Sequence, residues 1–92
     1  MDKLVIDIET KNTFQDVGGY DHLTDLKISF VGVYSYKQSA YLSFFENELE
    51  QLGPILQSAG LIIGFSTNRF DIPILNEYFR FNVKAIESLD IL

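Results

Sequence analysis

The 92-residue sequence contains no cysteine and no tryptophan, a single histidine and only two prolines. Without cysteine, neither a disulfide framework nor a thiolate zinc site can form. Basic residues are also scarce, because seven lysines and arginines stand against 13 acids, which gives a net charge of −6. This balance disfavours a nucleic-acid partner unless bound divalent cations reverse the charge locally.

Long apolar segments are missing as well. No apolar run approaches the roughly 20 residues that span a bilayer, and the N-terminus lacks the pattern of a secretory signal peptide. We therefore expect a cytoplasmic protein with no membrane partner. The 47 % of hydrophobic residues, with eight phenylalanines and five tyrosines, supply one core, so we expect a single domain over residues 1–92.

Strand and helix patterns alternate along the chain in the order β-β-β-α-β-α-β. Five segments have the composition of strands: 3–9, 26–36, 40–45, 61–65 and 83–91. Two segments have helical spacing of apolar residues: 47–59, which Gly53-Pro54 should kink or split, and 70–80. The second and third strands predict an antiparallel hairpin, and the helix-linked strands favour parallel pairing with the first. The expected fold is α/β, with a mixed five-stranded sheet.

The strand "KLVIDIETK" (3–11) carries two acids, Asp7 and Glu9, two positions apart on one face at its carboxyl end. Asp71 follows the carboxyl end of the fourth strand, where the second helix begins. In open α/β sheets, ligands bind outside the carboxyl ends of the parallel strands. If the first and fourth strands are neighbours, these three carboxylates converge on one crevice.

Carboxylates that lie this close repel each other unless cations compensate them. With no cysteine and one loop histidine, the ligands are all oxygens, which suit Mg²⁺ or Mn²⁺. Two such ions can activate a water and stabilise a leaving oxygen during phosphodiester cleavage. Simpler interpretations stay open: Asp7 and Glu9 as solvated surface acids, and Asp71 as a helix N-cap shortly before Pro73.

Two motifs resemble those of a known family. "DIET" (7–10) resembles the first motif, Asp-X-Glu, of the DnaQ-like 3′–5′ exonucleases, which have a ribonuclease H-like fold. "GFSTNRFDIPIL" (64–75) resembles the second motif of family-B DNA polymerase proofreading domains and their stand-alone relatives. The resemblance implies metal-dependent hydrolysis of single-stranded 3′ ends to nucleoside 5′-monophosphates. It also implies Asp7, Glu9 and Asp71 as catalytic ligands of two Mg²⁺ or Mn²⁺ ions, and a polymerase or helicase as partner of the parent protein.

The same resemblance places Thr10 and Phe70 near the terminal nucleotide. Lys11 and Arg69 flank the acids in the sequence, so they are the candidate phosphate contacts. The family's second motif usually has an asparagine four or five residues before the aspartate, where this sequence has Thr67 and Ser66.

The family's third motif is absent from the 92 residues. It supplies a fourth aspartate ligand and a water-orienting tyrosine or histidine after the fifth strand, and Asp90, in or beside that strand, is not this ligand. We therefore expect an incomplete exonuclease-like domain, truncated after strand five, with little or no activity. One face of its sheet should be uncovered and should pair with another copy as a homo-oligomer. The alternative is a non-catalytic ribonuclease H-like module for binding or oligomerisation, whose acids are remnants.

Overall fold

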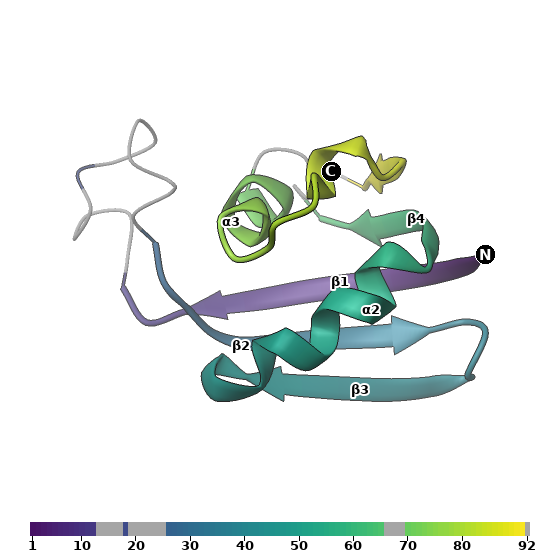
Figure 1. Cartoon of the computed structure of the whole chain (residues 1–92), viewed down its shortest axis with the longest axis horizontal. Coiled ribbons are helices and arrows are strands. Elements are labelled where there is room, and N and C mark those ends of the chain that lie inside the picture. The colour runs from purple at the N-terminus through teal and green to yellow at the C-terminus, as the bar shows by residue number, and fades with distance from the viewer. Residues whose placement is uncertain (13–17, 19–25, 66–69, 92) are drawn as a thin grey trace.

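The protein folds around one five-stranded sheet (Figure 1), seen in a computed structural model that describes residues 1–12, 18, 26–65 and 70–91. The strands are β1 (Asp2–Thr10), β2 (Ile28–Ser35), β3 (Ala40–Phe45), β4 (Ala59–Gly64) and β5 (Ser88–Asp90). The helices are η2 (Glu46–Gln51), α2 (Leu52–Gln57), α3 (Ile72–Asn76) and η4 (Val83–Ala85), of which η2 and η4 are 3₁₀-helices.

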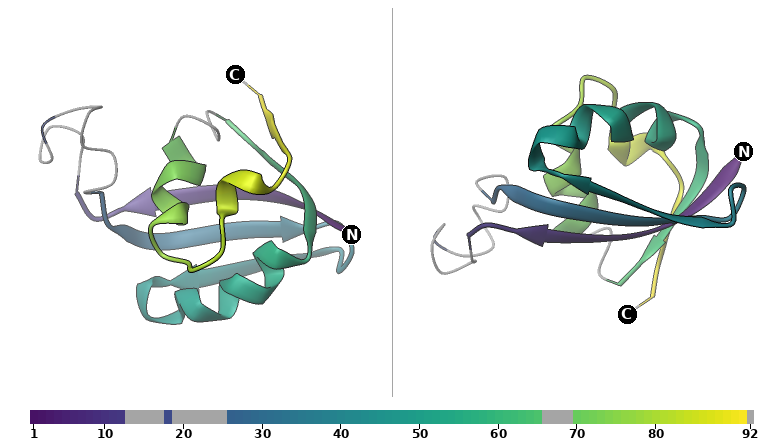
Figure 2. Two further views of the ribbon diagram at one scale, coloured as in Figure 1. Left: turned by 45° about the horizontal axis from the view of Figure 1, so that its top comes forward. Right: turned by 90° about the horizontal axis from the view of Figure 1, so that it is seen from below.

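The strand order is β3-β2-β1-β4-β5, with β1 at the centre. β2 is antiparallel to both β1 and β3, whereas β4 is parallel to β1 and β5 is parallel to β4. These pairings confirm the predicted mixed sheet. The crossovers through α2 and α3 both move toward the β5 edge, and crossovers of this kind are right-handed. Both helices therefore lie on the same face of the sheet (Figure 2).

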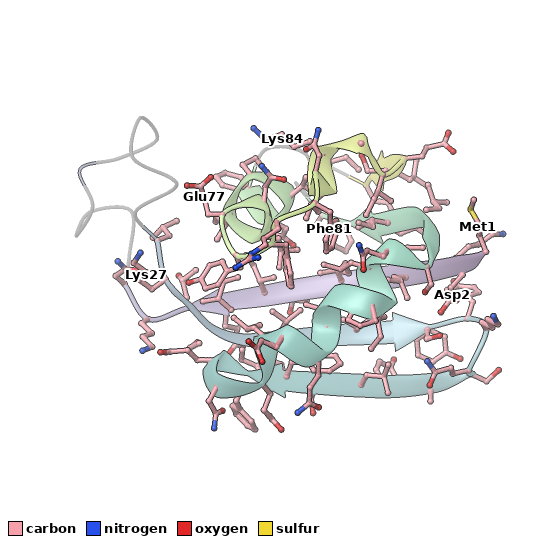
Figure 3. All side chains as sticks on the ribbon, in the orientation of Figure 1. Met1, Asp2, Lys27, Glu77, Phe81 and Lys84 are labelled. Atoms are coloured by element: carbon pink, nitrogen blue, oxygen red, sulfur yellow. The ribbon has the colours of Figure 1, made fainter. Side chains whose placement is uncertain are left out.

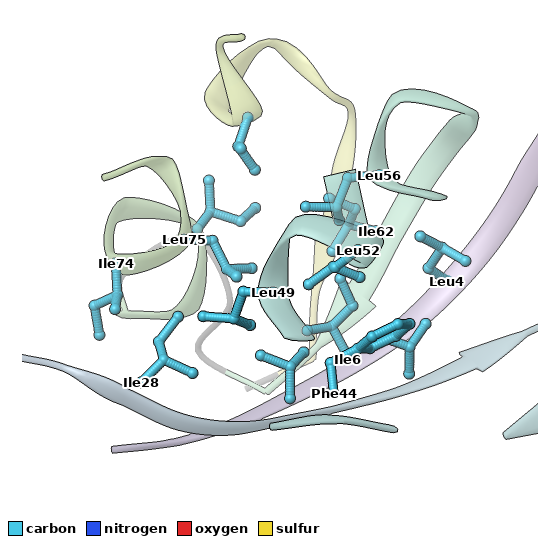
Figure 4. Close-up of a cluster of buried hydrophobic side chains, with 14 of the residues drawn as sticks. Leu4, Ile6, Ile28, Phe44, Leu49, Leu52, Leu56, Ile62, Ile74 and Leu75 are labelled. Carbon is cyan, nitrogen blue, oxygen red and sulfur yellow. The ribbon is translucent and has the colours of Figure 1, made fainter. Parts of the chain in front are cut away.

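The alternation of side chains along β1 divides the strand between the core and the surface. Leu4 and Ile6 point toward the helices and are 0 % and 3 % exposed. They pack in a cluster with α2 and α3 residues such as Leu52 and Leu75 (Figure 4). The intervening residues of β1, including Asp7, are exposed on the opposite face.

A buried carboxylate fixes the start of β1 to the β2–β3 hairpin. Asp2 accepts hydrogen bonds from the Ser35 hydroxyl and from the backbone amide of Lys37, the latter at 2.8 Å (Figure 3 labels Asp2). The Ser35 hydroxyl holds the pKa of Asp2 below its ordinary value, assisted by the Lys37 amide. The hairpin turn therefore has a fixed position beside the N-terminal end of β1.

The strands β1, β2 and β4 begin or end one or two residues from their predicted bounds, and three other elements differ more. The segment 47–59 is divided, as Gly53-Pro54 indicates, because a 3₁₀-helix precedes α2. The helix predicted over 70–80 is shorter, Ile72–Asn76. The Asn76 side chain accepts a hydrogen bond from the Val83 amide at 2.9 Å, so the chain after α3 turns back toward Asn76 instead of continuing the helix. The fifth strand begins at Ser88, because Asn82 caps the 3₁₀-helix η4 (Val83–Ala85) in the segment where the strand was predicted to start.

Within the described part of the chain, no helix has the length and apolar character needed to cross a membrane.

Candidate active site

The carboxyl ends of β1 and β4 define a crevice. The two strands are parallel neighbours, as the convergence of the acids requires, and their last paired residues are Val5 and Ile63. β1 continues beyond this pair to Thr10, while the chain from β4 leaves toward α3. Asp7 and Glu9 therefore lie on a part of β1 that β4 does not accompany.

Asp71 reaches this region from the start of α3. Asp71 is buried, with 9 % of its surface exposed. It occupies the N-cap position of α3, but its side chain makes no capping hydrogen bond, so capping does not account for it. Burial raises the pKa of Asp71 to about 7, and the negative charges of Asp7 and Asp90 add to the increase. The structure thus brings the carboxylates of Asp7 and Asp71 within electrostatic reach of each other.

Asp90 is a member of this acidic cluster that sequence reasoning set aside. It is the last residue of β5, where it pairs with Gly64, and its Oδ1 atom is buried. The expectation that Asp90 belongs to strand five is confirmed, yet its charge still acts on Asp71. The rule that placed Asp71 also points to Asp90, because Asp71 follows β4 and Asp90 ends β5, and both strands run parallel to β1 in the same sheet.

Glu9 shares the exposed face of β1 with Asp7 and lies opposite Phe30 of β2. Among residues 1–12, 18, 26–65 and 70–91, no three acidic or histidine side chains lie close enough together to hold a metal ion. The donor chemistry nevertheless fits a hard divalent cation, because the charges that act on Asp71 from the described residues are those of the carboxylates Asp7 and Asp90. Asp7 and Asp71 are the pair that would hold such an ion, and Glu9 is the additional donor on the same strand.

A hollow of about 440 Å³ lies between the end of β1 and α3. Its lining is mainly apolar and consists of Ile8, Thr10, Asn12, Leu26, Phe70, Asp71 and Ile74. The Thr10 hydroxyl donates a hydrogen bond to the backbone carbonyl of Asn12 at 2.8 Å. Two predicted substrate-binding residues, Thr10 and Phe70, therefore share one hollow with Asp71. The sequence analysis did not predict four other lining residues as parts of a site, because no motif connects them: Ile8, Asn12, Leu26 and Ile74.

Of the two residues predicted to contact phosphates, Lys11 and Arg69, the structure describes only Lys11. Lys11 forms an ion pair with Glu46 of η2, and both side chains are about half exposed. Its ammonium group is therefore directed toward η2. Arg69 lies outside the described residues, as do Thr67 and Ser66. The role of Lys11 and Arg69 in phosphate binding stays a prediction.

Comparison with known proteins gives a structural match only. No protein-family model matches the sequence, and no curated protein matches it. The structure of the family B DNA polymerase from the hyperthermophilic archaeon Pyrobaculum calidifontis is similar, with a TM-score of 0.59 and 19 % identity. The match covers 83 % of this chain and 10 % of the polymerase chain. At this identity the likeness shows the fold, and it confirms the predicted α/β, ribonuclease H-like class.

Proposed function

We propose that the protein has the site of a metal-dependent 3′–5′ exonuclease of the DnaQ-like kind, which hydrolyses phosphodiester bonds at single-stranded 3′ ends to nucleoside 5′-monophosphates. The observation that carries the proposal is the position of Asp7 near the carboxyl end of β1 and of Asp71 after β4, its parallel neighbour, where the charge of Asp7 acts on Asp71. The matching fold of the family B polymerase supports it.

In this proposal Asp7, Glu9 and Asp71 hold Mg²⁺ or Mn²⁺. When bound by these carboxylates, such ions would supply Lewis-acid chemistry for activating a water and stabilising a leaving oxygen. Asp71 is the residue whose charge state responds most to the cation, because its carboxyl is buried beside other acids. A divalent ion next to it favours the ionised form, which is the form that coordinates a metal.

The terminal nucleotide enters the hollow between β1 and α3. Its volume of about 440 Å³ and mostly apolar lining suit a base or sugar ring, and Phe70 offers an aromatic face. Thr10 contacts the nucleotide through its backbone or hydroxyl. Lys11 and Arg69 contact the phosphates, and for Lys11 this requires release from Glu46.

Metal binding gives the first test. Titration calorimetry with Mn²⁺ should show heat for the wild type, and Asp7→Asn and Asp71→Asn should each weaken binding about tenfold or more, since each removes a charged ligand. Glu77→Gln is the matched control, because it removes an exposed acid from the end of α3. Heat that is the same in all four proteins would place the metal elsewhere and refute the site.

Activity gives the second test. Because the third motif is absent from the 92 residues, we expect only slow, Mn²⁺-dependent shortening of a 3′-end single strand labelled at its 5′ end. Asp7→Ala should abolish this activity, and the products should be nucleoside 5′-monophosphates. Activity that is unchanged in Asp7→Ala would show that the acids of β1 do not catalyse it.

A non-catalytic ribonuclease H-like module is the second candidate. One observation favours it: aromatic side chains such as Tyr36 and Tyr41 are exposed. The absence of any Mn²⁺ heat in the wild type would select this candidate over the exonuclease.

A further inference from the structure

The face of the sheet opposite the helices exposes large apolar side chains. Tyr41 of β3 is 84 % exposed and Leu89 of β5 is 51 % exposed, so apolar side chains are exposed at both edges of the sheet. The helices of the described residues all lie on the other face (Figure 2). An apolar surface of this extent is typical of an interaction site.

Five residues on this face form one straight row across all five strands. Tyr41 pairs with Tyr34, Tyr34 with Val5, Val5 with Ile63, and Ile63 with Leu89. The Tyr34 and Tyr41 rings are in edge contact, with centroids 4.8 Å apart. No member of the row is charged, so each one could face its own copy across a two-fold axis without repulsion.

The charges on either side of this row are opposite in sign. On β1, Lys3 lies two residues before Val5 and Asp7 lies two residues after it, and all three side chains are exposed on this face. The strand rise places each charge roughly 7 Å from the row. A two-fold rotation about the row exchanges the two sides, so Lys3 of one copy comes opposite Asp7 of the other.

The shape of the face follows the same symmetry. Gly32 of β2 and Tyr36, which directly follows β2, lie on opposite sides of Tyr34, and the Tyr36 and Tyr34 rings are in edge contact with centroids 5.5 Å apart. Gly32 has no side chain and forms one part of a hollow of about 600 Å³ that extends across the row, since Asp7 and Tyr36 both line it. The same rotation places the half-exposed Tyr36 ring of one copy over the Gly32 hollow of the other.

We infer that two copies of this chain associate through the uncovered sheet faces, around a two-fold axis along the row Tyr41–Tyr34–Val5–Ile63–Leu89. The reciprocal contacts are Lys3 with Asp7 and Tyr36 with Gly32. Such an isologous interface needs one self-complementary patch, which this face provides. Five strands span roughly 24 Å by 20 Å at ordinary strand spacing and length, which approaches the size of a small specific interface.

The observations that support this dimer do not rest on the proposed exonuclease site, but the dimer would cover Asp7, so metal binding at Asp7 and dimerisation would compete. A single-stranded nucleic acid stacking on the exposed aromatic rings is the competing occupant. The net charge of −6 and the position of Asp7 and Glu9 on this face disfavour it.

Sedimentation velocity over a concentration series tests the dimer. The wild type should shift from monomer to dimer as its concentration rises. Tyr41→Glu should weaken association about tenfold or more, because two negative charges would meet on the axis. A wild type that remains monomeric at several hundred micromolar would overturn the proposal, as would a dimer that Tyr41→Glu leaves intact.

Charge reversal tests the axis itself. Lys3→Asp and Asp7→Lys should each weaken the dimer, and the double variant should restore it, because opposite charges again face each other. Lys84→Asp is the matched control on the helical side (Figure 3), and it should leave association unchanged. Failure of the double variant to restore association would refute this axis, provided circular dichroism shows that the variant is folded.

Two further measurements test the fit of Tyr36 over Gly32 and the competing binding of a nucleic acid. Gly32→Leu fills the hollow and should weaken the dimer. It should leave the monomer folded, because the nearest atom to an added Cβ is a Phe30 ring carbon at 3.4 Å. Fluorescence anisotropy with a labelled single-stranded oligonucleotide should show no binding that depends on Tyr41. Tyr41-dependent binding by a monomeric protein would overturn the proposal in favour of the nucleic acid.

Discussion

The hydroxyl of Tyr78 accepts a hydrogen bond from the backbone amide of Ile28 at 2.8 Å. This contact joins the segment that follows α3 to the first residue of β2. Ile28 lies where the β1–β2 register shifts, opposite Thr10. The hydrogen bond therefore fixes the chain just after α3 over the part of the sheet that leads to the candidate site, while Asp71 lies at the start of α3.

Removal of this acceptor should destabilise the fold. Tyr78→Phe leaves the partly buried Ile28 amide without its partner, and we expect a loss of about 1–2 kcal/mol in the free energy of unfolding. Urea unfolding followed by circular dichroism measures it. Tyr41→Phe, at a tyrosine that is 84 % exposed, should change the stability by less than about 0.5 kcal/mol. Equal losses in the two variants would contradict the assigned role of Tyr78.

The raised pKa of Asp71 makes stability fall as pH rises. The carboxyl has its ordinary pKa of 3.8 in the unfolded chain and about 7 in the native protein. Between these values the native state binds more protons than the unfolded state, so the free energy of unfolding decreases with pH and levels off above about pH 7.

Asp71→Asn should remove this dependence. At pH 8 we expect the variant to exceed the wild type by about 1–3 kcal/mol, after allowance for solvent screening. Below pH 3.8 the wild-type carboxyl is neutral, and the two proteins should have similar stability. Urea unfolding from pH 4 to pH 8.5 measures both trends, and parallel pH curves would show that Asp71 is not the responsible group.

Asp90 should act on Asp71 through its charge. Asp90→Asn removes one of the two negative neighbours, so the pKa of Asp71 should fall, while burial keeps it above 3.8. Carboxyl ¹³C chemical shifts recorded over a pH series measure this change directly. Asp7→Asn should also lower the pKa of Asp71. Glu77→Gln, which changes an exposed acid, should leave the titration midpoint of Asp71 unchanged. An unchanged midpoint in Asp90→Asn would place Asp90 outside the cluster.

Asp2 should have the opposite pH behaviour. The Ser35 hydroxyl lowers the Asp2 pKa below 3.8, so its ionised form stabilises the native state above that pH and loses this effect as pH falls through the lowered value. Asp2→Asn should therefore melt a few degrees below the wild type at pH 7. The difference should narrow as the pH falls below 3.8. A constant difference in melting temperature across this range would exclude the charge as its cause.

The sheet and its chain order could be predicted because their signals are local. The apolar residues of β1 recur every second position, and the short turn before Ala40 joins two strands that must pair. The parallel pairing of β4 with β1 then follows from the helix between β3 and β4. Asp7 and Asp71 were found in the same way, because each stands at the carboxyl end of a recognisable strand.

The remaining features depend on contacts between distant residues. α3 ends at Asn76 where the apolar pattern would continue, since Asn76 and Tyr78 bind backbone amides elsewhere in the chain. The position of Lys11 depends on Glu46, which no sequence spacing connects to it. The approach of Asp90 to Asp71 depends on the short β5, whose start was wrongly placed at residue 83.

The two faces of β1 give the strand two separate sets of evolutionary constraints. Substitutions at Leu4 or Ile6 alter the packed interior, whereas substitutions at Val5 or Asp7 alter the exposed face and, for Asp7, the charge that acts on Asp71. Point mutations on the exposed face of β1 can therefore change the chemistry or the binding partners of the protein without disturbing the packing of the buried face. A single-residue insertion within β1 would be far more damaging than a substitution, because it would exchange the faces and place carboxylates inside the core.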